Sequence, residues 1–141
     1  MSRPLFHIVV LEDNPADLHM IMQTIQEAGV ACEFTVFNNG VEALAFIKGA
    51  ASPVPDLMIL DCNVPGMEGA SVLNSVRGDT RWFHVSVFMF TASRDPADVA
   101  RAEKLGADRC LMKPMDLAGF GALGHIVREW LEKNINSKIS N

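Results

Sequence analysis

The sequence predicts an α/β fold of the (βα)5 type, in which helices cover both faces of a five-stranded, doubly wound parallel sheet. Short apolar runs alternate with longer amphipathic segments five times along the chain. This alternation is typical of a parallel sheet with right-handed helical crossovers. The apolar run at 57–60 leads directly into Asp61, and a loop rich in Pro and Gly follows. A run bounded in this way indicates a strand buried on both faces.

The first β-α unit is marked by an apolar run and a helix cap. The run over 5–11 is expected to form a buried strand that ends in two carboxylates, Glu12 and Asp13. Asn14 is suited to cap the following helix, because its side-chain oxygen can accept from free backbone N–H groups, and a proline follows it. Gly29 is expected to close this helix. Its apolar side chains recur at helical spacing and are Leu18, Ile21, Met22 and Ile25.

The second β-α unit is shorter than the first. A strand is expected over 34–37 and a helix over 41–48, with a loop over 49–55 whose two prolines exclude regular structure. The side chains of this helix that point inward are expected to be Val41, Leu44, Ala45 and Phe46.

The last three units repeat the pattern. They are expected to comprise strands at 57–60, 85–90 and 110–112, and helices at 69–77, at 95–105 and from Asp116 onward. The helix at 95–105 has a thin apolar face, so we expect it to pack loosely. The last helix contains three glycines, which lower its intrinsic helicity. It also carries a long apolar stripe of Leu117, Phe120, Leu123, Ile126, Val127, Trp130 and Leu131.

Length and composition indicate one globular domain. A chain of 141 residues with 49% hydrophobic and 21% charged residues can bury a full core without disulfide bonds. We expect a single domain over 1–133 and a polar C-terminal tail over 134–141. The net charge of −5 argues against non-specific binding of nucleic acid. Cys32, Cys62 and Cys110 form no CxxC spacing, and no segment resembles a signal peptide or membrane span, so a cytoplasmic location is expected.

Polar side chains follow four of the predicted strands, and parallel strands all end at one edge of a sheet. They are Glu12 and Asp13 after the first strand, Asp61 after the third, Thr91 after the fourth and Lys113 after the fifth. Ligands bind at this edge in open α/β folds. Clustered carboxylates repel one another unless a cation intervenes, and an all-oxygen site suits Mg²⁺. A carboxylate nucleophile, a divalent ion, a lysine and a hydroxyl together can carry out phosphoryl transfer.

Each of these residues also has an ordinary explanation when it is taken alone. Asp61 can cap a strand or a turn, Glu12 and Asp13 can lie in a solvated loop, and Thr91 can cap a helix. Their agreement on one edge of the sheet favours a site over these separate explanations.

Taken together, these features resemble the receiver domain of two-component response regulators. The resemblance covers about residues 5–131 and is specific in order and spacing. The motifs that carry it are Leu11-Glu12-Asp13-Asn14, Leu60-Asp61-Cys62-Asn63-Val64-Pro65-Gly66-Met67-Glu68-Gly69, Phe90-Thr91-Ala92-Ser93, Gly106-Ala107-Asp108 and Lys113-Pro114. The resemblance implies a flavodoxin-like, CheY-like fold and a stand-alone regulator, because the chain is used up by this one unit.

The resemblance also implies roles for the residues at the edge. Asp61 would accept a phosphoryl group from a histidine kinase. Lys113 would pair with the phosphoryl oxygens, and Thr91 would swing to bond one of them. The residues that would hold Mg²⁺ are Glu12, Asp13, Asp61 and the backbone carbonyl of Asn63. The protein would then signal through a phosphorylation-dependent protein–protein surface, and it would catalyse only its own phosphotransfer and autodephosphorylation.

Finer features resemble the single-domain receivers that serve phytochrome-type kinases. They are the segments 12–17 and 113–117, Phe120, and the late Glu129-Trp130-Leu131. The expected partners are a sensor histidine kinase and a downstream protein, with neither nucleic acid nor membrane. The apolar residues of the last helix exceed what one side of a sheet requires. They are either core or part of a two-fold homodimer or kinase-docking patch.

One position departs from the family pattern. Receivers usually carry Tyr or Phe three residues before the lysine, whereas this chain has Cys110. Either the switch depends on Thr91 and the loop after it, with Cys110 as passive filler, or Cys110 is a redox-sensitive element. The passive interpretation is favoured, because neighbouring Arg109 should point to the opposite face of the strand and no other thiolate stabiliser is identifiable.

Two other functions compete with the receiver. A phosphohydrolase with an aspartyl nucleophile, of the haloacid-dehalogenase-like kind, needs a second Asp two residues after the first, and Asn63 stands there. A flavodoxin-like cofactor module needs a Gly-rich phosphate loop after the first strand. Glu12 and Asp13 occupy that place and would repel a phosphate.

Overall fold

The structure is a computed structural model that describes residues 5–64 and 68–140, with side chains described through residue 134. In these ranges five parallel strands form one sheet in the order β2-β1-β3-β4-β5. The strands are β1 (Phe6–Leu11), β2 (Cys32–Phe37), β3 (Leu57–Asp61), β4 (Ser86–Thr91) and β5 (Arg109–Met112). The helices are α1 (Pro15–Glu27), α2 (Gly40–Lys48), α3 (Gly69–Arg77), α4 (Pro96–Lys104) and α5 (Leu117–Ser140).

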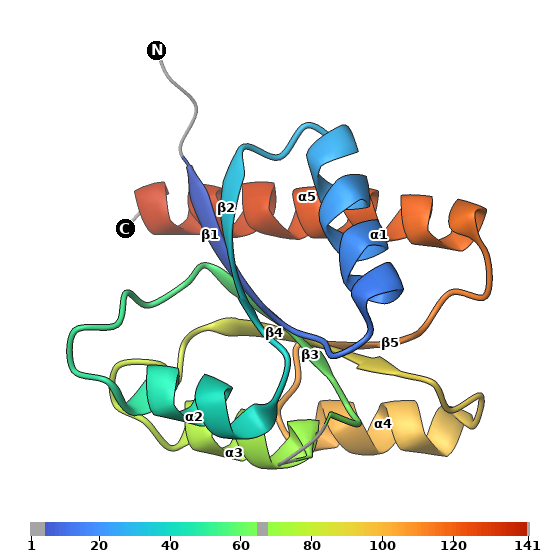
Figure 1. Cartoon of the computed structure of the whole chain (residues 1–141). Helices are drawn as coiled ribbons and strands as arrows, with labels where there is room; N and C mark the ends of the chain where they lie inside the picture. Colours follow the sequence, from blue (N-terminus) through green and yellow to red (C-terminus); the bar gives the residue numbers. More distant parts are fainter. Residues whose placement is uncertain (1–4, 65–67, 141) are drawn as a thin grey trace.

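Helices cover both faces of the sheet, as predicted. Figure 1 shows α1 and α5 on one face and α2, α3 and α4 on the other. Alternate residues of β1 point to opposite sides, as the pleat requires. Ile8 and Val10 pack in the core under α1 and α5, whereas Val9 and Leu11 pack in the core on the other face. The central strand β3 is buried along its whole length, so its last residue, Asp61, is delivered to the edge by a rigid element.

The caps predicted for α1 are present. Asn14 Oδ1 accepts from the backbone N–H groups of Ala16 and Asp17 at 2.9 and 3.1 Å. Gly29 follows the helix with a φ of 89°, a conformation that a residue without Cβ adopts at no steric cost. The ends of α1 are therefore set by local sequence, and this fixes where its first turn lies relative to β1.

The face of α2 differs from the prediction. Val41 is 58% exposed and Ala45 is also exposed, whereas Ala43 and Ile47 are buried. Phe46 packs in an aromatic cluster, with ring centroids 5.2 Å from Phe37 and 5.8 Å from Trp82. The helix turns Ala43, Phe46 and Ile47 toward the core, because the aromatic contacts of Phe46 bury more apolar area than burial of Val41 and Ala45 would.

The apolar stripe of α5 belongs largely to the core. Its buried members are Phe120, Leu123, Val127 and Leu131. Trp130 packs edge-on against Phe88 of β4, with ring centroids 5.3 Å apart, and its indole Nε1 donates to Ser86 Oγ at 2.8 Å. Leu117, at the start of the helix, is 72% exposed. The stripe therefore covers the sheet, which accounts for most of its apolar surface without a second molecule.

Glycine at position 124 of α5 has a packing reason. A Cβ built on Gly124 would collide with the backbone oxygen of Thr24 in α1. The Thr24 hydroxyl also donates to the backbone oxygen of Gly121 at 3.3 Å. Glycine lowers the intrinsic helicity of α5 here, but it allows α1 and α5 to approach closely.

The C-terminal helix is longer than the sequence predicted. α5 continues through Ser140, so its backbone includes most of the segment expected to be a tail. No Pro or Gly interrupts residues 132–140, and the Asn134 side chain donates to the backbone oxygen of Trp130 at 2.7 Å. The other predicted elements agree with the structure to within one or two residues at their ends. The Pro, Gly and Met of the loop after Asp61, at 65–67, lie outside the described residues.

Candidate functional site

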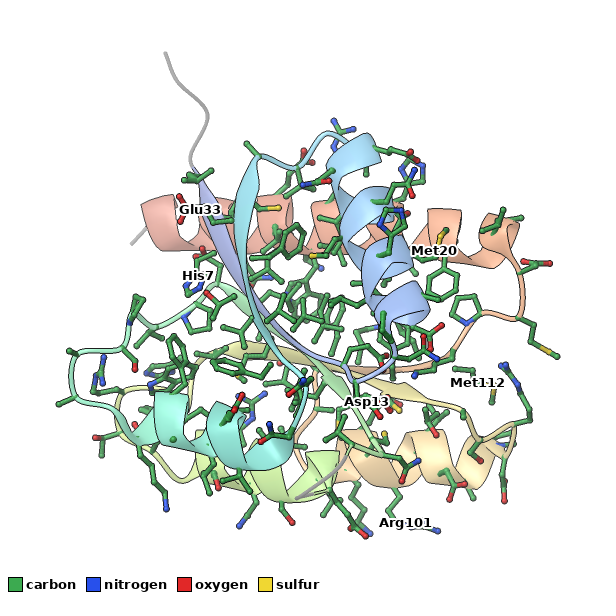
Figure 2. The ribbon with its side chains drawn as sticks, in the orientation of Figure 1. His7, Asp13, Met20, Glu33, Arg101 and Met112 are labelled. Atoms are coloured by element: carbon green, nitrogen blue, oxygen red, sulfur yellow. The ribbon has the colours of Figure 1, made fainter. Side chains whose placement is uncertain are left out.

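Three carboxylates meet at the carboxyl edge of the sheet. Glu12 and Asp13 follow β1, Asp61 ends β3, and ligand oxygens of the three lie within 4.8 Å of one another. Figure 2 shows Asp13 at the end of β1, far from His7 near the start of that strand. Glu12 and Asp61 are buried, whereas Asp13 is exposed. The sequence prediction that strand ends would gather these carboxylates is confirmed.

Lys113 provides the positive charge for this cluster. Its ammonium lies 2.9 Å from Glu12 Oε1, 2.9 Å from Asp61 Oδ2 and 3.1 Å from Asp17 Oδ2. The backbone N–H of Lys113 donates to the oxygen of Thr91 at 2.7 Å, and this bond holds the end of β5 against β4. Three carboxylates thus share one ammonium in a part-buried site, where charge pairing is stronger than in water.

The carboxylates of the site carry more negative charge than the lysine alone can offset. Burial raises the pKa of Glu12 to about 7; the hydrogen bond with Lys113 acts in the opposite direction, and Asp61 raises the pKa further. Burial by itself would lower the pKa of Lys113, but its bonds to Asp61, Glu12 and Asp17 raise it above its usual value. The lysine therefore stays charged, and Glu12 is poised between its two states near neutral pH.

The donor set fits a hard divalent cation. Magnesium and manganese prefer oxygen ligands, and a buried carboxylate with a raised pKa is a group that a cation would stabilise in its charged form. Asn63 lies beside the cluster, since its backbone N–H donates to Asp61 Oδ1 at 3.0 Å. Glu12, Asp13 and Asp61 can therefore hold a metal, and the backbone of Asn63 adjoins them at Asp61.

Glu12→Gln should remove a pH dependence of stability in the metal-free protein. A pKa raised from 4.5 to about 7 means that the native state binds more protons than the unfolded state between these values. Stability then falls as pH rises through this window and stays lower above it. Above pH 7 the variant should be more stable than wild type by about 2 kcal/mol, part of the gain being offset by the lost Lys113 contact.

Urea denaturation over a pH series tests this effect. The difference between Glu12→Gln and wild type should shrink as the pH falls toward 4.5, because the wild-type carboxyl becomes protonated in both states only below that value. Glu42→Gln is the matched control, because Glu42 is exposed in the first turn of α2. Parallel curves for Glu12→Gln and wild type would contradict the raised pKa.

Thr91 faces the same edge from β4. Its Oγ1 accepts from the backbone N–H of Ser93 at 3.0 Å. The Ser93 hydroxyl, in turn, hydrogen-bonds Asp98 Oδ2. Thr91, Ser93 and Asn63 line a cavity of about 350 Å³ that extends toward α4. Its lining also includes Cys62, so the cavity begins at the residues that directly follow Asp61.

A contact between two thiols was not anticipated from the sequence. Burial raises the pKa of Cys62 to about 12, with Cys110 and Asp61 adding to the rise and a hydrogen bond to Thr91 opposing it. Burial also raises the pKa of Cys110. The raised pKa values keep both thiols out of the reactive thiolate form, which supports the passive interpretation of Cys110.

Two further residues at the edge have contacts that sequence reasoning missed. The sequence predicts no contact for Asp17 at this edge, whereas its carboxylate contacts Lys113. Arg94 donates to the backbone oxygen of Lys113 at 2.5 Å, linking the loop after β4 to the end of β5. The available signal was their position near this edge, with Asp17 in the first turn of the helix after β1 and Arg94 in the loop after β4.

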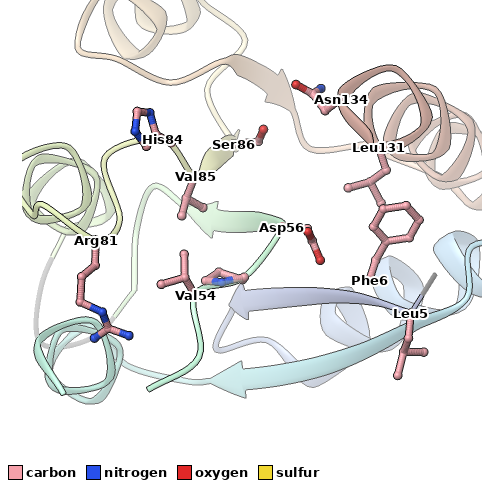
Figure 3. A pocket seen from close by; sticks show the side chains of 11 residues that line it. Leu5, Phe6, Val54, Asp56, Arg81, His84, Val85, Ser86, Leu131 and Asn134 are labelled. Atoms are coloured by element: carbon pink, nitrogen blue, oxygen red, sulfur yellow. The ribbon is translucent and has the colours of Figure 1, made fainter. Parts of the chain in front are cut away.

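A second cavity lies at the opposite, amino end of the sheet. Figure 3 shows its lining, which includes Phe6, Asp56, Arg81 and Ser86, and its volume is about 300 Å³. Its two charged side chains already have partners: Asp56 Oδ2 accepts from the His7 N–H at 2.8 Å, and Arg81 donates to the oxygen of Gly49 at 2.9 Å. The candidate site is therefore the acidic edge.

The parallel topology and the acidic edge with its lysine define the class of receiver-type signalling domains. The chain belongs to the response regulator receiver domain family, whose model matches residues 8–122. It is therefore a receiver of two-component signalling. No helix in the part of the chain that the structure describes is long and apolar enough to cross a membrane.

Similar proteins include stand-alone receivers. The response regulator Rcp1 of Synechocystis sp. (strain ATCC 27184 / PCC 6803 / Kazusa) is 27% identical over 136 residues, covering 93% of this chain and 92% of Rcp1. The phosphorylated cyanobacterial phytochrome response regulator RcpA superposes with a TM-score of 0.83 at 26% identity, covering 92% of this chain and 96% of RcpA. The Mn²⁺-bound form of Rcp1 superposes with a TM-score of 0.81 at 27% identity, covering 90% of this chain and 95% of Rcp1.

Proposed function

We propose that this protein is a single-domain response regulator that accepts a phosphoryl group from a histidine kinase on Asp61. One observation carries the proposal: the Lys113 ammonium lies 2.9 Å from Asp61 Oδ2, beside the cluster that contains Glu12 and Asp13. This arrangement supplies a nucleophile, a fixed positive charge and ligands for a cation at one edge. The output is a phosphorylation-dependent surface recognised by another protein.

The residues at the edge divide the reaction among them. The Asp61 carboxylate attacks the phosphorus of the donor phosphohistidine; a P–O bond forms, the P–N bond breaks, and its electron pair stays with the imidazole. Lys113 balances charge on the phosphoryl oxygens, and Thr91 turns its hydroxyl to donate to one of them. Mg²⁺ would supply charge neutralisation as a Lewis acid when held by Glu12, Asp13, Asp61 and the backbone carbonyl of Asn63.

The proposed donor is a phytochrome-type histidine kinase. The similarity to RcpA, a phytochrome response regulator, supports this choice.

The proposed downstream partner is a protein rather than nucleic acid or membrane, consistent with the net charge of −5. Three free thiols accord with a cytoplasmic location. We also propose that the chain can form a homodimer. Met115 and Leu117, which are 87% and 72% exposed beside the site, offer apolar surface for contact with a partner protein or with a second copy of the chain.

The phosphohydrolase alternative is the weaker one. Asn63, rather than a second acid, follows Asp61 by two residues, and an amide is not a general acid for a leaving group. We therefore propose no reaction beyond phosphotransfer to Asp61 and hydrolysis of the resulting acyl phosphate.

Incubation with acetyl phosphate and Mg²⁺ tests the proposed function. The expected product is a protein with one added phosphoryl group that is lost in alkali, as acyl phosphates are. Sustained turnover of a chromogenic phosphate ester, with no labelled protein, would instead favour the phosphohydrolase. Phosphotransfer profiling against the kinases of the source organism would then identify the donor.

The switch should depend on Thr91 and not on Cys110. Thr91→Ala should still be phosphorylated, but the gain in partner affinity on phosphorylation should fall by about tenfold, since a hydrogen bond to a charged group contributes about 1.5 kcal/mol. Cys110→Ala should retain both phosphorylation and the gain. Kinase affinity or self-association, measured with and without beryllofluoride as phosphoryl mimic, separates the variants. Loss of the gain in Cys110→Ala alone would make the cysteine the switch.

A further inference from the structure

Asp17 is a fourth carboxylate at the acidic edge, and it contacts the lysine from the side of α1. Its Oδ2 lies 3.1 Å from Lys113 Nζ, although the two residues are 96 positions apart in sequence. An ammonium has three N–H donors. Asp17 Oδ2 and Asp61 Oδ2 accept hydrogen bonds from it at 3.1 and 2.9 Å. Glu12 Oε1 adds an ion pair at 2.9 Å.

The position of Asp17 is fixed by the start of α1. Its backbone N–H donates to Asn14 Oδ1 at 3.1 Å, and α1 packs along α5 through Thr24 and Gly121. Its side chain is 29% exposed, against 1% for Glu12 and 7% for Asp61. The contact with Lys113 therefore comes from a rigid helix end at the rim of the site.

Asp17 is also separate from the carboxylates that can hold a metal. The cluster whose ligand oxygens lie within 4.8 Å of one another contains Glu12, Asp13 and Asp61 and, among the described residues, does not include Asp17. A cation in this cluster competes with the Lys113 ammonium for oxygens of Glu12 and Asp61. The bond from Lys113 to Asp17 involves none of these oxygens, so a metal need not break it.

We propose that Asp17 is a positioning residue: it holds the Lys113 ammonium at the rim of the site while Glu12 and Asp61 engage the cation and the phosphoryl group. This inference rests on the proposed function and adds a residue to its machinery. Without Asp17, the ammonium keeps only Glu12 and Asp61 as partners and must be displaced from them by an incoming cation. Asp17 thereby makes the cluster available to Mg²⁺ and keeps the lysine within reach of Asp61.

The first test is Mg²⁺ affinity, measured by calorimetry on the full chain without a phosphoryl donor. Asp17→Ala should weaken Mg²⁺ binding by about fivefold, the size expected when one partly exposed ion pair is lost. Asp17→Glu should recover most of the affinity, because it restores a carboxylate with slightly longer reach. Glu42→Gln is the matched control: it removes a first-turn carboxylate from the wall of the neighbouring cavity that also contains Glu12 and Asp13. It should change affinity by less than about twofold, as expected for an exposed charge.

The second test asks whether Asp17 acts through the lysine. In a Lys113→Met background, Asp17→Ala should weaken Mg²⁺ binding no more than Glu42→Gln does. At saturating Mg²⁺, Asp17→Ala should also be phosphorylated by acetyl phosphate several-fold more slowly than wild type, while its final labelling stays stoichiometric.

Two results would overturn the inference. One is an Asp17→Ala protein with wild-type Mg²⁺ affinity; the other is an affinity loss of the same size in the Lys113→Met background. A wild-type chain that binds Mg²⁺ but is never labelled at Asp61 would instead refute the proposed function. The measurements of Mg²⁺ affinity need no phosphoryl donor, so they would still test the role of Asp17 in that case.

Discussion

Asp61→Asn should abolish phosphoryl labelling, whereas the wild-type chain should take up one phosphoryl group per molecule. An amide oxygen is a much weaker nucleophile than a carboxylate, and no bond to phosphorus forms without the nucleophile. The variant should keep its fold. The Asn63 N–H, which donates to Asp61 Oδ1 at 3.0 Å, can still donate to an amide oxygen at this position. Intact-mass measurement after incubation with acetyl phosphate and Mg²⁺ gives the stoichiometry, and circular dichroism checks the fold.

Asp116→Asn is the matched control for this experiment. Asp116 is exposed just after Lys113 and accepts from the backbone N–H of Gly119 at 2.9 Å, so its loss leaves the acidic cluster intact. This variant should be labelled as wild type is. Chelation with EDTA should stop labelling of the wild type, because clustered anions repel an anionic donor. Stoichiometric labelling of Asp61→Asn would move the acceptor to another residue, and labelling in EDTA would remove the metal from the proposal.

The residues at the carboxyl edge could be predicted because each strand end is recognisable from the few residues around it. Each strand is an apolar run that ends at or near a polar residue, and a parallel sheet brings the carboxyl ends of all its strands to one edge. The strand ends alone predict that Asp61 and Lys113 lie together at this edge. Their 2.9 Å separation agrees with that expectation.

Contacts between elements could not be predicted to the same degree. The bond between Asp17 and Lys113 depends on how α1 is rotated against the sheet, and local periodicity does not specify that rotation. Local periodicity likewise predicts an inward Val41, although the structure exposes it and buries Ala43, because the rotation of α2 is set by its packing against the sheet. The thiol contact between Cys62 and Cys110 crosses an intervening strand and has no sequence signature.

The charge balance of the site has a direct consequence for Lys113. Lys113→Met keeps a long apolar stem and removes the ammonium shared by Glu12, Asp61 and Asp17. Above pH 7 without metal, we expect the free energy of unfolding to fall by about 3 kcal/mol, because buried carboxylates are left without a cation. Mg²⁺ should restore most of this loss, since it binds the native cluster and not the unfolded chain. Its affinity for the variant should exceed that for wild type, because no ammonium competes for Glu12 and Asp61.

Urea denaturation with and without Mg²⁺ measures both effects. Lys104→Met is the matched control, because Lys104 is an exposed lysine in the last turn of α4 and its loss should change stability by less than about 0.5 kcal/mol. Lowering the pH below 7 should narrow the gap between Lys113→Met and wild type, since protonation of Glu12 removes one of the unpaired charges. A Lys113→Met protein as stable as wild type, with no added response to Mg²⁺, would mean that the ammonium is not the counter-charge of the cluster. In that case the lysine could not act on a phosphoryl group at Asp61 by the charge pairing proposed here.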